Sequence, residues 1–389
     1  MQLIKKTSIA LAAAALLATA SLGTAVQAAE NGLPDSMTWT AYGTGSSGYS
    51  QSVAIGNVLK NKYGTNLAVK PGKNDISRMT PLKLGKADYC ACGIASYFGF
   101  EGVTLFASQA WGPQPIRLLL ASSGSSGLGI GTPADANILA ASDLKGKRIA
   151  WVRGADALNV PMTATLAFAG LTWDDVTKTE FSGYAASWEA LNTGQVDAAF
   201  GSTVTPLAKK LAASPRGIRW IPLPHDDEKS WTRFSDVAPY FVKKIATSGA
   251  DITKDSPWEG SSYPYPILVG NADRSADEVY TLVKAIVEGY DDYKDNAPGA
   301  KGWALANQNT QWVIPYHEGA VRYLKEAGVW SEAAQLHNDN LLARQDIIMA
   351  SWKTFIADNP PSDKDAFKTA WLAARKASLE KAGLPVVFE

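Results

Sequence analysis

The sequence predicts an α/β protein with two lobes. Two observations lead to this fold class. A strand–helix pattern occurs twice, with a spacing of about 110 residues. The chain of 389 residues is also longer than one hydrophobic core usually supports, which favours more than one domain.

The first unit begins with Met37 to Tyr42, where apolar and hydroxyl residues alternate as they do in a strand. Its further elements follow in order: the loop Gly43 to Tyr49, a helix whose stripe is Ala54, Ile55, Val58 and Leu59, the strand Leu67 to Val69, the loop Pro71 to Asn74, a short helix from Asp75 to Gly85, and the sequence Gly85-Lys86-Ala87-Asp88 before the buried strand Tyr89 to Gly93.

The second unit repeats this order. It contains the strand Arg148 to Val152, the loop Arg153 to Asp156, the helix Leu158 to Ala169, the strand Thr179 to Phe181, the loop Ser182 to Tyr184, a helix with Trp188 and Leu191 that ends at Gly194, and Gly194-Gln195-Val196-Asp197 before the strand Ala198 to Gly201. Two successive βαβαβ units with short loops predict two α/β lobes with parallel strands.

The chain has to cross between the lobes. The stretch Ser122 to Gly127, after the strand Ile116 to Ala121, is the first expected crossing, and the second is expected after the strand Ile218 to Leu223. Two crossings between rigid lobes form a hinge. The expected limits are 29–124 for lobe I, 125–235 for lobe II, 236–330 for a return segment to lobe I, and 331–389 for a C-terminal extension.

The N-terminus predicts export. Two lysines precede an apolar stretch from Ser8 to Ala20, and Val26-Gln27-Ala28 is a small-x-small cleavage site. The apolar stretch is shorter than the roughly 20 residues of a membrane span. We therefore expect a signal peptide over 1–28, cleavage after about Ala28, and a soluble monomer in the periplasm.

The composition excludes several classes of protein. Lys plus Arg and Asp plus Glu are both 37, and no basic patch of the kind that nucleic acid requires is present. Three scattered histidines and two cysteines predict no metal site, and we expect no cofactor. Cys90 and Cys92 would share one face of a strand without good bridging geometry, so we expect two buried thiols.

The loops after the strands predict a binding site for an anion. Ligands of α/β sheets bind beyond the carboxyl ends of the strands, where helices begin and free N–H groups point outward. Hydroxyl and amide groups gather in these loops, which suits a carboxylate held by neutral donors. The candidate ligand-binding residues are Thr44, Gly45, Ser46, Ser47, Tyr49, Asn74, Ser96, Arg153, Gly154, Ala155, Tyr184 and Ser202.

Arg153 is the expected charged anchor, because a guanidinium can bind a carboxylate through two parallel hydrogen bonds. A surface pair with Asp156 is the alternative, and Arg117 and Arg78 are the next candidates. The aromatic residues expected near these loops favour a larger or aromatic carboxylate; they are Trp111, Trp188, Tyr42, Tyr49, Tyr97 and Tyr184.

Two enzyme classes are disfavoured. Gly43 to Gly48 matches G-x-G-x-x-G, but Lys70 and Lys73 stand where a dinucleotide site needs an acidic residue. No G-x-S-x-G nucleophile elbow lies in the glycine–serine clusters. The three histidines suit structural roles, and for His317 we expect capping or packing. The chain is therefore not expected to be an enzyme.

Several segments resemble the TAXI family of TRAP-transporter solute receptors. The resemblance lies in Thr44-Gly45-Ser46-Ser47-Gly48-Tyr49, Asp143-Leu144-Lys145-Gly146-Lys147-Arg148, Gly194 to Phe200, Ser262-Tyr263-Pro264-Tyr265-Pro266 and Ile314 to Tyr323. It implies a type II periplasmic-binding-protein fold, no catalysis, and delivery of a small organic anion to the membrane subunits of a TRAP-type permease.

The sequence departs from this family in three places. The loop Arg153 to Asn159 has fewer hydroxyls and an added arginine, and the stretch around Lys73-Asn74-Asp75 is altered. Residues 331–389 extend past the family's usual end and resemble two added amphipathic helices. A secreted ligand-binding sensor is the alternative function, and an exported hydrolase that uses the glycine–serine loops is a further one.

Overall fold

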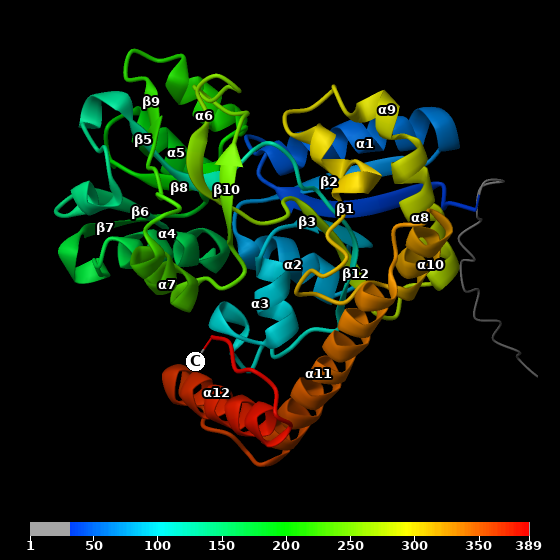
Figure 1. Ribbon diagram of the computed structural model, residues 1–389. Coiled ribbons are helices and arrows are strands. Elements are labelled where there is room, and N and C mark those ends of the chain that lie inside the picture. Colours follow the sequence, from blue (N-terminus) through cyan, green and yellow to red (C-terminus); the bar gives the residue numbers. More distant parts are fainter. Residues whose placement is uncertain (1–31, 389) are drawn as a thin grey trace, which may run out of the picture.

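The computed structural model describes residues 32–388, which form two lobes side by side and two long helices beneath them (Figure 1). The expected signal peptide, residues 1–28, lies outside the described residues. Within residues 32–388, no helix combines the length and the hydrophobicity that a membrane span requires.

Lobe I is built on a sheet that has five strands in the described part of the chain. Their spatial order is β2 (Asn66–Gly72), β1 (Ser36–Tyr42), β3 (Tyr89–Cys92), β12 (Ile267–Asn271) and β4 (Ile116–Ala121). β1 is parallel to β2 and β3, whereas β12 is antiparallel to β3 and β4. The helices of this lobe are α1 (Ser47–Tyr63), α2 (Asp75–Lys83), α3 (Ala95–Glu101), α8 (Ala276–Glu288), α9 (Tyr290–Tyr293) and α10 (Glu318–Glu326).

Lobe II repeats this strand order. β6 (Arg148–Val152) and β7 (Thr177–Phe181) are parallel, and β5 (Leu128–Pro133) lies antiparallel between β8 (Ala199–Ser202) and β9 (Ile218–Trp220). A bridge between Ile149 and Ala198 connects β6 to β8. The order is thus β7-β6-β8-β5-β9. The helices of this lobe are α4 (Asp156–Phe168), α5 (Tyr184–Asn192), α6 (Pro206–Ala212) and α7 (Glu228–Val237).

The repeated Gly-x-x-Asp sequences have the same structural role in both lobes. Oδ2 of Asp88 accepts a hydrogen bond from the N–H of Thr38, and Oδ2 of Asp197 accepts one from the N–H of Arg148, both at 2.8 Å. Gly85 and Gly194 have φ of 63° and 77°, a left-handed conformation that glycine adopts without steric cost. Each aspartate therefore ties the turn before its own strand to the first strand of the unit. The expected α/β fold with two lobes and a helical C-terminal extension is confirmed.

The chain crosses from β4 to β5 over residues 122–127 and returns to lobe I at residues 263–266. The hairpin of β10 (Val242–Ala246) and β11 (Trp258–Ser262) still belongs to lobe II. Nε1 of Trp258 donates to the carbonyl of Ile221 at 3.0 Å, and the N–H of Leu223 donates to the carbonyl of Glu259 at 2.9 Å. The second crossing therefore comes later than the limit expected at 235, because Trp258 anchors this hairpin on lobe II.

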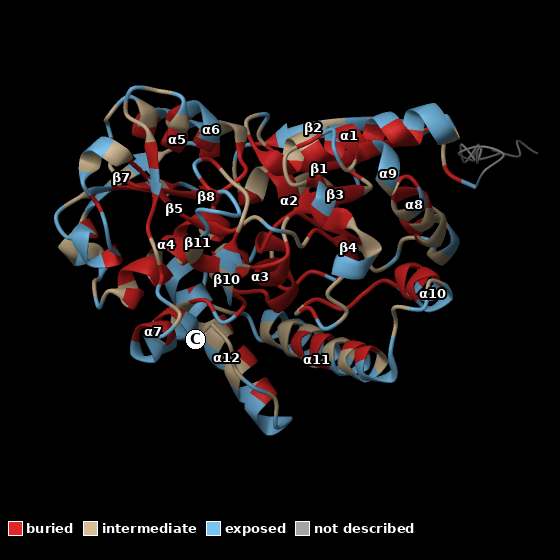
Figure 2. Cartoon of the chain, turned by 45° about the horizontal axis from the view of Figure 1, so that its top comes forward, coloured by how far each residue is buried: buried red, intermediate tan, exposed pale blue. Residues whose placement is uncertain are grey.

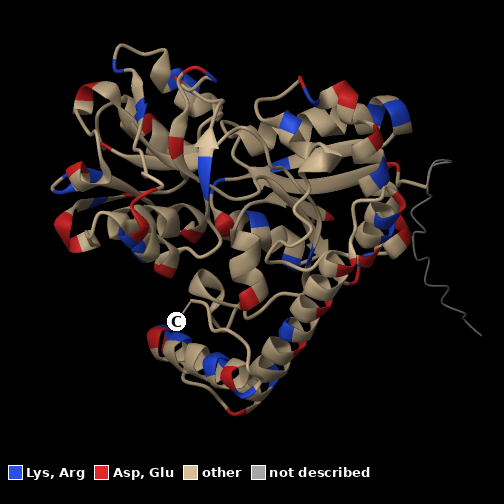
Figure 3. Cartoon of the chain, viewed as in Figure 1, with Lys and Arg blue, Asp and Glu red and all other residues tan. Residues whose placement is uncertain are grey.

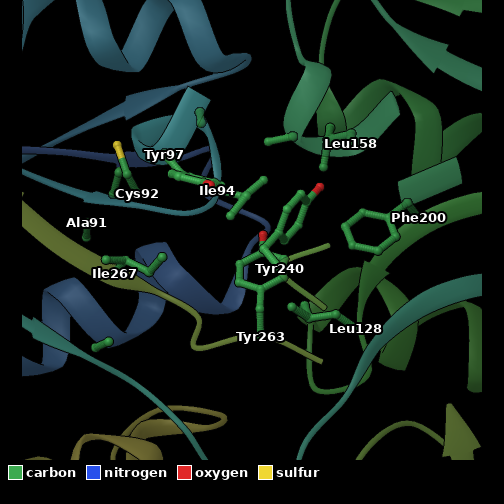
Figure 4. Close-up of a cluster of buried hydrophobic side chains, with 14 of the residues drawn as sticks. Ala91, Cys92, Ile94, Tyr97, Leu128, Leu158, Phe200, Tyr240, Tyr263 and Ile267 are labelled. Carbon is green, nitrogen blue, oxygen red and sulfur yellow. The ribbon is translucent and has the colours of Figure 1, made fainter. Parts of the chain in front are cut away.

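The hydrophobic core is continuous between the lobes. Buried residues occupy the sheets and the inner faces of the helices (Figure 2), and one cluster of buried side chains includes residues of both lobes. In Figure 4, Leu128, Leu158 and Phe200 of lobe II converge with Tyr240 and Tyr263. Lys and Arg residues and Asp and Glu residues are distributed over both lobes and the C-terminal helices (Figure 3).

Cys90 and Cys92 form a disulfide, so the expectation of two free thiols is wrong. Their Cα atoms are 5.2 Å apart, within the range that a disulfide can bridge. Both residues lie on β3 and are buried, as expected, but the bridging geometry that was expected to be poor is met at this Cα separation.

The C-terminal extension consists of α11 (Glu332–Ala357) and α12 (Lys364–Lys381), which fold back on each other below lobe I (Figure 1). Ile348, Phe367 and Trp371 form a small second core together with Ala107, which precedes β4 of lobe I. After α12, the chain turns back toward the lobes. The ring of Phe388 lies 5.5 Å from that of Tyr97 in lobe I and 6.3 Å from that of Tyr240.

Candidate functional site

A small cavity lies where the two lobes meet. Its volume is about 20 Å³, which is room for about one water molecule. No charged side chain lines it among the described residues. The lining residues are Tyr42, Ser47, Leu128, Leu158, Tyr184, Phe200, Gly201, Ser202, Tyr263 and Tyr265.

The first turn of α1 forms one wall of this cavity. Ser46 is the N-cap, and its Oγ accepts a hydrogen bond from the N–H of Tyr49 at 3.2 Å. Ser47 is 1% exposed, and its hydroxyl faces the phenol of Tyr265 without another hydrogen-bond partner within the described chain. The hydroxyl of Tyr265 lies close to this turn, since a Cβ atom on Gly48 would come within 2.9 Å of it. A buried hydroxyl and free backbone N–H groups at a helix N-terminus form a position where an anion would be stabilised.

Four tyrosines line the cavity beside this turn: Tyr42, Tyr184, Tyr263 and Tyr265. The rings of Tyr42 and Tyr265 are 5.4 Å apart, and those of Tyr263 and Tyr265 are 6.3 Å apart. Burial raises the pKa of Tyr42 well above its ordinary value and that of Tyr265 to about 12. The phenols therefore stay protonated near neutral pH. They offer neutral O–H donors and aromatic walls.

A buried cation, the guanidinium of Arg78, lies next to Tyr42. The guanidinium of Arg78 lies 3.4 Å from the centre of the Tyr42 ring, a cation–π contact, and Arg78 is 1% exposed. Its Nη2 pairs with Oδ1 of Asp75 at 2.5 Å. The positive charge of Arg78 also lowers the pKa of Tyr265, against the larger effect of burial. Arg78 can therefore stabilise negative charge near Tyr42 and Tyr265 without lining the cavity.

Direct hydrogen bonds hold the two lobes together around the cavity. The N–H of Asp75 donates to the carbonyl of Gly154 at 2.9 Å, and Nδ2 of Asn74 donates to that of Arg153 at 3.1 Å. On the other side of the cavity, Oγ1 of Thr205 donates to the carbonyl of Gly45 at 3.1 Å. The lobes are thus closed on each other.

The structure brings some of the sequence-predicted site residues together and separates others. Ser47, Tyr184 and Ser202 line the cavity. Gly45, Asn74 and Gly154 lie in the contact between the lobes, and Ala155 is the N-cap of α4. Thr44 is exposed and Tyr49 is half-buried. Ser96 is buried in lobe I, where its Oγ donates to the carbonyl of Gly93 at 2.7 Å.

Arg153, the expected anchor, has an exposed side chain and does not belong to the lining of the cavity. Arg117 points elsewhere too, since its Nη1 donates to Oε1 of Gln345 on α11. Of the three arginines considered from the sequence, Arg78 alone contacts a residue that lines the cavity, within the described chain.

Sequence reasoning did not select Asp75 or the tyrosines of the return segment, Tyr263 and Tyr265. The sequence Tyr263-Pro264-Tyr265-Pro266 was a usable signal, because a segment that crosses between lobes has to pass the cleft. Leu128, Leu158, Phe200 and Gly201 complete the lining, and generic strand and helix patterns gave no reason to single them out.

The histidines have structural partners in this fold. Nδ1 of His317 accepts a hydrogen bond from the N–H of Gly319 at 3.2 Å, so the expected capping role is confirmed. His225 and His337 contact backbone carbonyls, those of Gly260 and Trp312. Across residues 32–388, no group of three or more His, Cys, Asp and Glu side chains could hold a metal ion.

Comparison with solved structures gives proteins of low sequence identity. The chain is 17% identical to an alkanesulfonate-binding protein from Xanthomonas axonopodis pv. citri bound to MOPS, over 92% of this chain and 96% of that chain, with a TM-score of 0.43. It is 13% identical to an ancestral arginine-binding protein bound to arginine, over 70% and 99%, with a TM-score of 0.44. A periplasmic aliphatic sulphonate binding protein from Escherichia coli is 13% identical over 91% and 90%, with a TM-score of 0.42.

A protein-family comparison covers most of the chain. The sequence profile of the NMT1-like family matches residues 40–328, from β1 to the end of α10. This match includes both lobes and excludes the C-terminal helices. Since it covers well over half of the 389 residues, the chain belongs to the NMT1-like family.

Proposed function

We propose that this chain is an extracytoplasmic solute receptor without catalytic activity. It binds a small organic anion between its lobes and delivers it to a membrane transporter. The ligand is a carboxylate, with aromatic acids and amino acids as the first candidates, and the transporter is a TRAP-type permease. The periplasm is the proposed location, after removal of the N-terminal 28 residues.

One observation carries the ligand class. The buried hydroxyl of Ser47, at the first turn of α1, lines the cavity beside the phenol of Tyr265, and the buried Arg78 lies over the neighbouring Tyr42 ring. A carboxylate there would accept hydrogen bonds from neutral donors and meet the positive end of a helix of 17 residues. Tyr42, Tyr184, Tyr265 and Phe200 would enclose the rest of an aromatic ligand.

The proposed delivery of the ligand to the transporter depends on movement of the lobes. A cavity of about 20 Å³ is too small for an organic acid, so the lobes have to lie further apart than in this structure for the ligand to enter and to remain bound. A ligand that touches both lobes favours a form that is closed around it, and the permease would recognise that liganded form. The resemblance of Thr44 to Tyr49 and of Ile314 to Tyr323 to TRAP-associated receptors supports this type of partner.

A thermal-shift screen of organic acids tests the ligand class. Benzoate, phenylacetate and aromatic amino acids would be compared with benzamide and phenylacetamide, which keep the ring and lack the charge. An acid at a hundred times its Kd adds about 2.7 kcal/mol of stability and should raise Tm by several degrees. If the amides stabilise the protein as much as the acids do, the carboxylate proposal is contradicted. Uptake through TRAP-type membrane subunits in vesicles tests the partner.

A further inference from the structure

The two helices that follow the first strand of each repeat have equivalent positions in the two lobes. α1 follows β1 in lobe I, and α4 follows β6 in lobe II. Ser47 on the first turn of α1 and Leu158 near the start of α4 both line the cavity. The cleft therefore lies between two helix N-termini, each of which can stabilise one negative charge.

The N-terminus of α4 is already capped by a carboxylate of the other lobe. Its N-cap residue is Ala155, whose side chain cannot accept a hydrogen bond. The N–H of Ala157 instead donates to Oδ2 of Asp75 at 2.8 Å. Asp75 is completely buried and belongs to α2 of lobe I.

A pair with Arg78 alone does not account for this placement. Arg78 contacts Oδ1 of Asp75, whereas Oδ2 is the atom that accepts from Ala157. The backbone N–H of Asp75 also donates to the carbonyl of Gly154. Gly154 has φ of 69°, and a Cβ atom there would come within 2.9 Å of Nδ2 of Asn74. The close approach of the two loops thus depends on a glycine, and it presents the carboxylate to α4.

We infer that Asp75 is an internal counter-anion that fills the anion position of lobe II, so that the closed cleft accepts a ligand with one negative charge and disfavours a second. This inference rests on the proposed function, because it assigns the remaining anion position, at α1, to the ligand. A dicarboxylate would have to displace Asp75 from Ala157 or place a like charge beside it.

Two ligands of matched structure test whether the cleft prefers one negative charge to two. Phenylacetate and 1,4-phenylenediacetate share a ring and differ in the number of carboxylates. Calorimetry on the full mature chain should give phenylacetate at least tenfold tighter binding, equal to about 1.4 kcal/mol. In Asp75→Asn the ratio should fall to within threefold. Asp174→Asn is the matched control, because it removes an exposed carboxylate of lobe II.

Amide hydrogen exchange tests the capping contact without any ligand. We expect the amide of Ala157 to exchange at least tenfold faster in Asp75→Ala than in the wild type, with no change in Asp174→Asn. If Asp75→Ala does not fold, Asp75→Ala combined with Arg78→Met removes both buried charges and serves the same purpose.

Two results would overturn the inference: equal affinity of the wild type for the two acids, or unchanged exchange of the Ala157 amide without the Asp75 carboxylate. If neither acid binds any variant, both the inferred preference for one negative charge and the proposed ligand class are contradicted. The exchange measurement then still decides whether Asp75 caps α4, so the two failures can be told apart.

Discussion

Asp75 and Arg78 are buried one helical turn apart on α2, and their environment sets the electrostatics of the cleft. Burial raises the pKa of Asp75 to about 6, against the opposing effects of Arg78 and of the N–H of Ala157. Asp156 raises this pKa further. The negative charge of Asp75 in turn contributes to raising the pKa of three tyrosines, Tyr42, Tyr240 and Tyr263. A carboxyl group with such a pKa changes its charge at a mildly acidic pH.

This raised pKa predicts a pH dependence of stability. The folded chain binds the Asp75 proton more tightly than the unfolded chain, whose carboxyl has a pKa near 3.8. The stabilising effect of this proton is complete below pH 4 and is lost as the pH rises through 6. A difference of roughly two pKa units corresponds to about 3 kcal/mol.

Urea unfolding between pH 4 and pH 7 measures this effect. The free energy of unfolding of the wild type, relative to Asp75→Asn, should fall by about 3 kcal/mol over that range. Parallel curves for the two proteins would show that Asp75 keeps its ordinary pKa in the folded chain.

The exposed position of Arg153 leads to a prediction about ligand binding. Because its side chain lies outside the cavity lining, we expect Arg153→Ala to bind the carboxylate within threefold of the wild type. If Arg153 is the anchor that the sequence suggests, removing a charged contact of about 2–3 kcal/mol would weaken binding roughly thirty- to hundredfold. Titration calorimetry separates the two outcomes.

The C-terminal helices are attached to lobe I through the end of α3. Glu101 is completely buried, and its carboxylate accepts hydrogen bonds from Arg344 of α11, at 2.7 and 2.9 Å, and from Arg375 of α12. Nε1 of Trp371 donates to the carbonyl of Gly102 at 2.7 Å. One buried carboxylate thus joins three helices. The extension is therefore an integral part of the folded protein.

We expect Glu101→Gln to destabilise the protein by about 3–5 kcal/mol, because it leaves two arginines buried without their counter-charge. Glu189→Gln is the control, since its ion pair with Lys210 is about half exposed and such pairs contribute up to about 1 kcal/mol. Chemical unfolding of both variants provides the measurement. A loss below 1 kcal/mol in Glu101→Gln would contradict this account of the attachment.

Elements that are fixed by local sequence were predictable. The strands Ser36–Tyr42 and Arg148–Val152 and the helices after them followed from side-chain periodicity and from the glycines that end each unit. The turns before Asp88 and Asp197 recur because each aspartate bonds a strand of its own unit. The two C-terminal helices were recognisable from their amphipathic pattern.

Features that depend on contacts distant in sequence were not predictable. The carboxylate of Asp75 meets Ala157, which is 82 residues away, and no local pattern connects these positions. The hairpin that holds Trp258 on lobe II depends on a carbonyl 37 residues earlier. The loop Gly45 to Ser47 was correctly expected at the meeting place of the lobes, because strand ends lie there in any α/β sheet.

The whole molecule has two closed lobes and a cavity smaller than its proposed ligand. We therefore expect the ligand to enter a more open form and to hold the lobes around itself, further apart than they lie in this structure. Small-angle scattering should therefore give different radii of gyration with and without the ligand. An identical radius in both states would indicate a preformed pocket, and the handover would then have to involve another part of the chain.

The central claim is that a carboxylate binds at the first turn of α1, and titration calorimetry of Gly48→Val tests it most directly. A side chain at Gly48 would come within 2.9 Å of the Tyr265 hydroxyl, at the turn that carries Ser47. Gly43→Val is the matched control, because a Cβ atom there has no neighbour within 4 Å. With the acid that stabilises the wild type most in the thermal-shift screen, we predict no detectable binding to Gly48→Val. Gly43→Val should keep wild-type affinity, and both variants should keep the wild-type circular dichroism. Wild-type affinity in a folded Gly48→Val would contradict the claim.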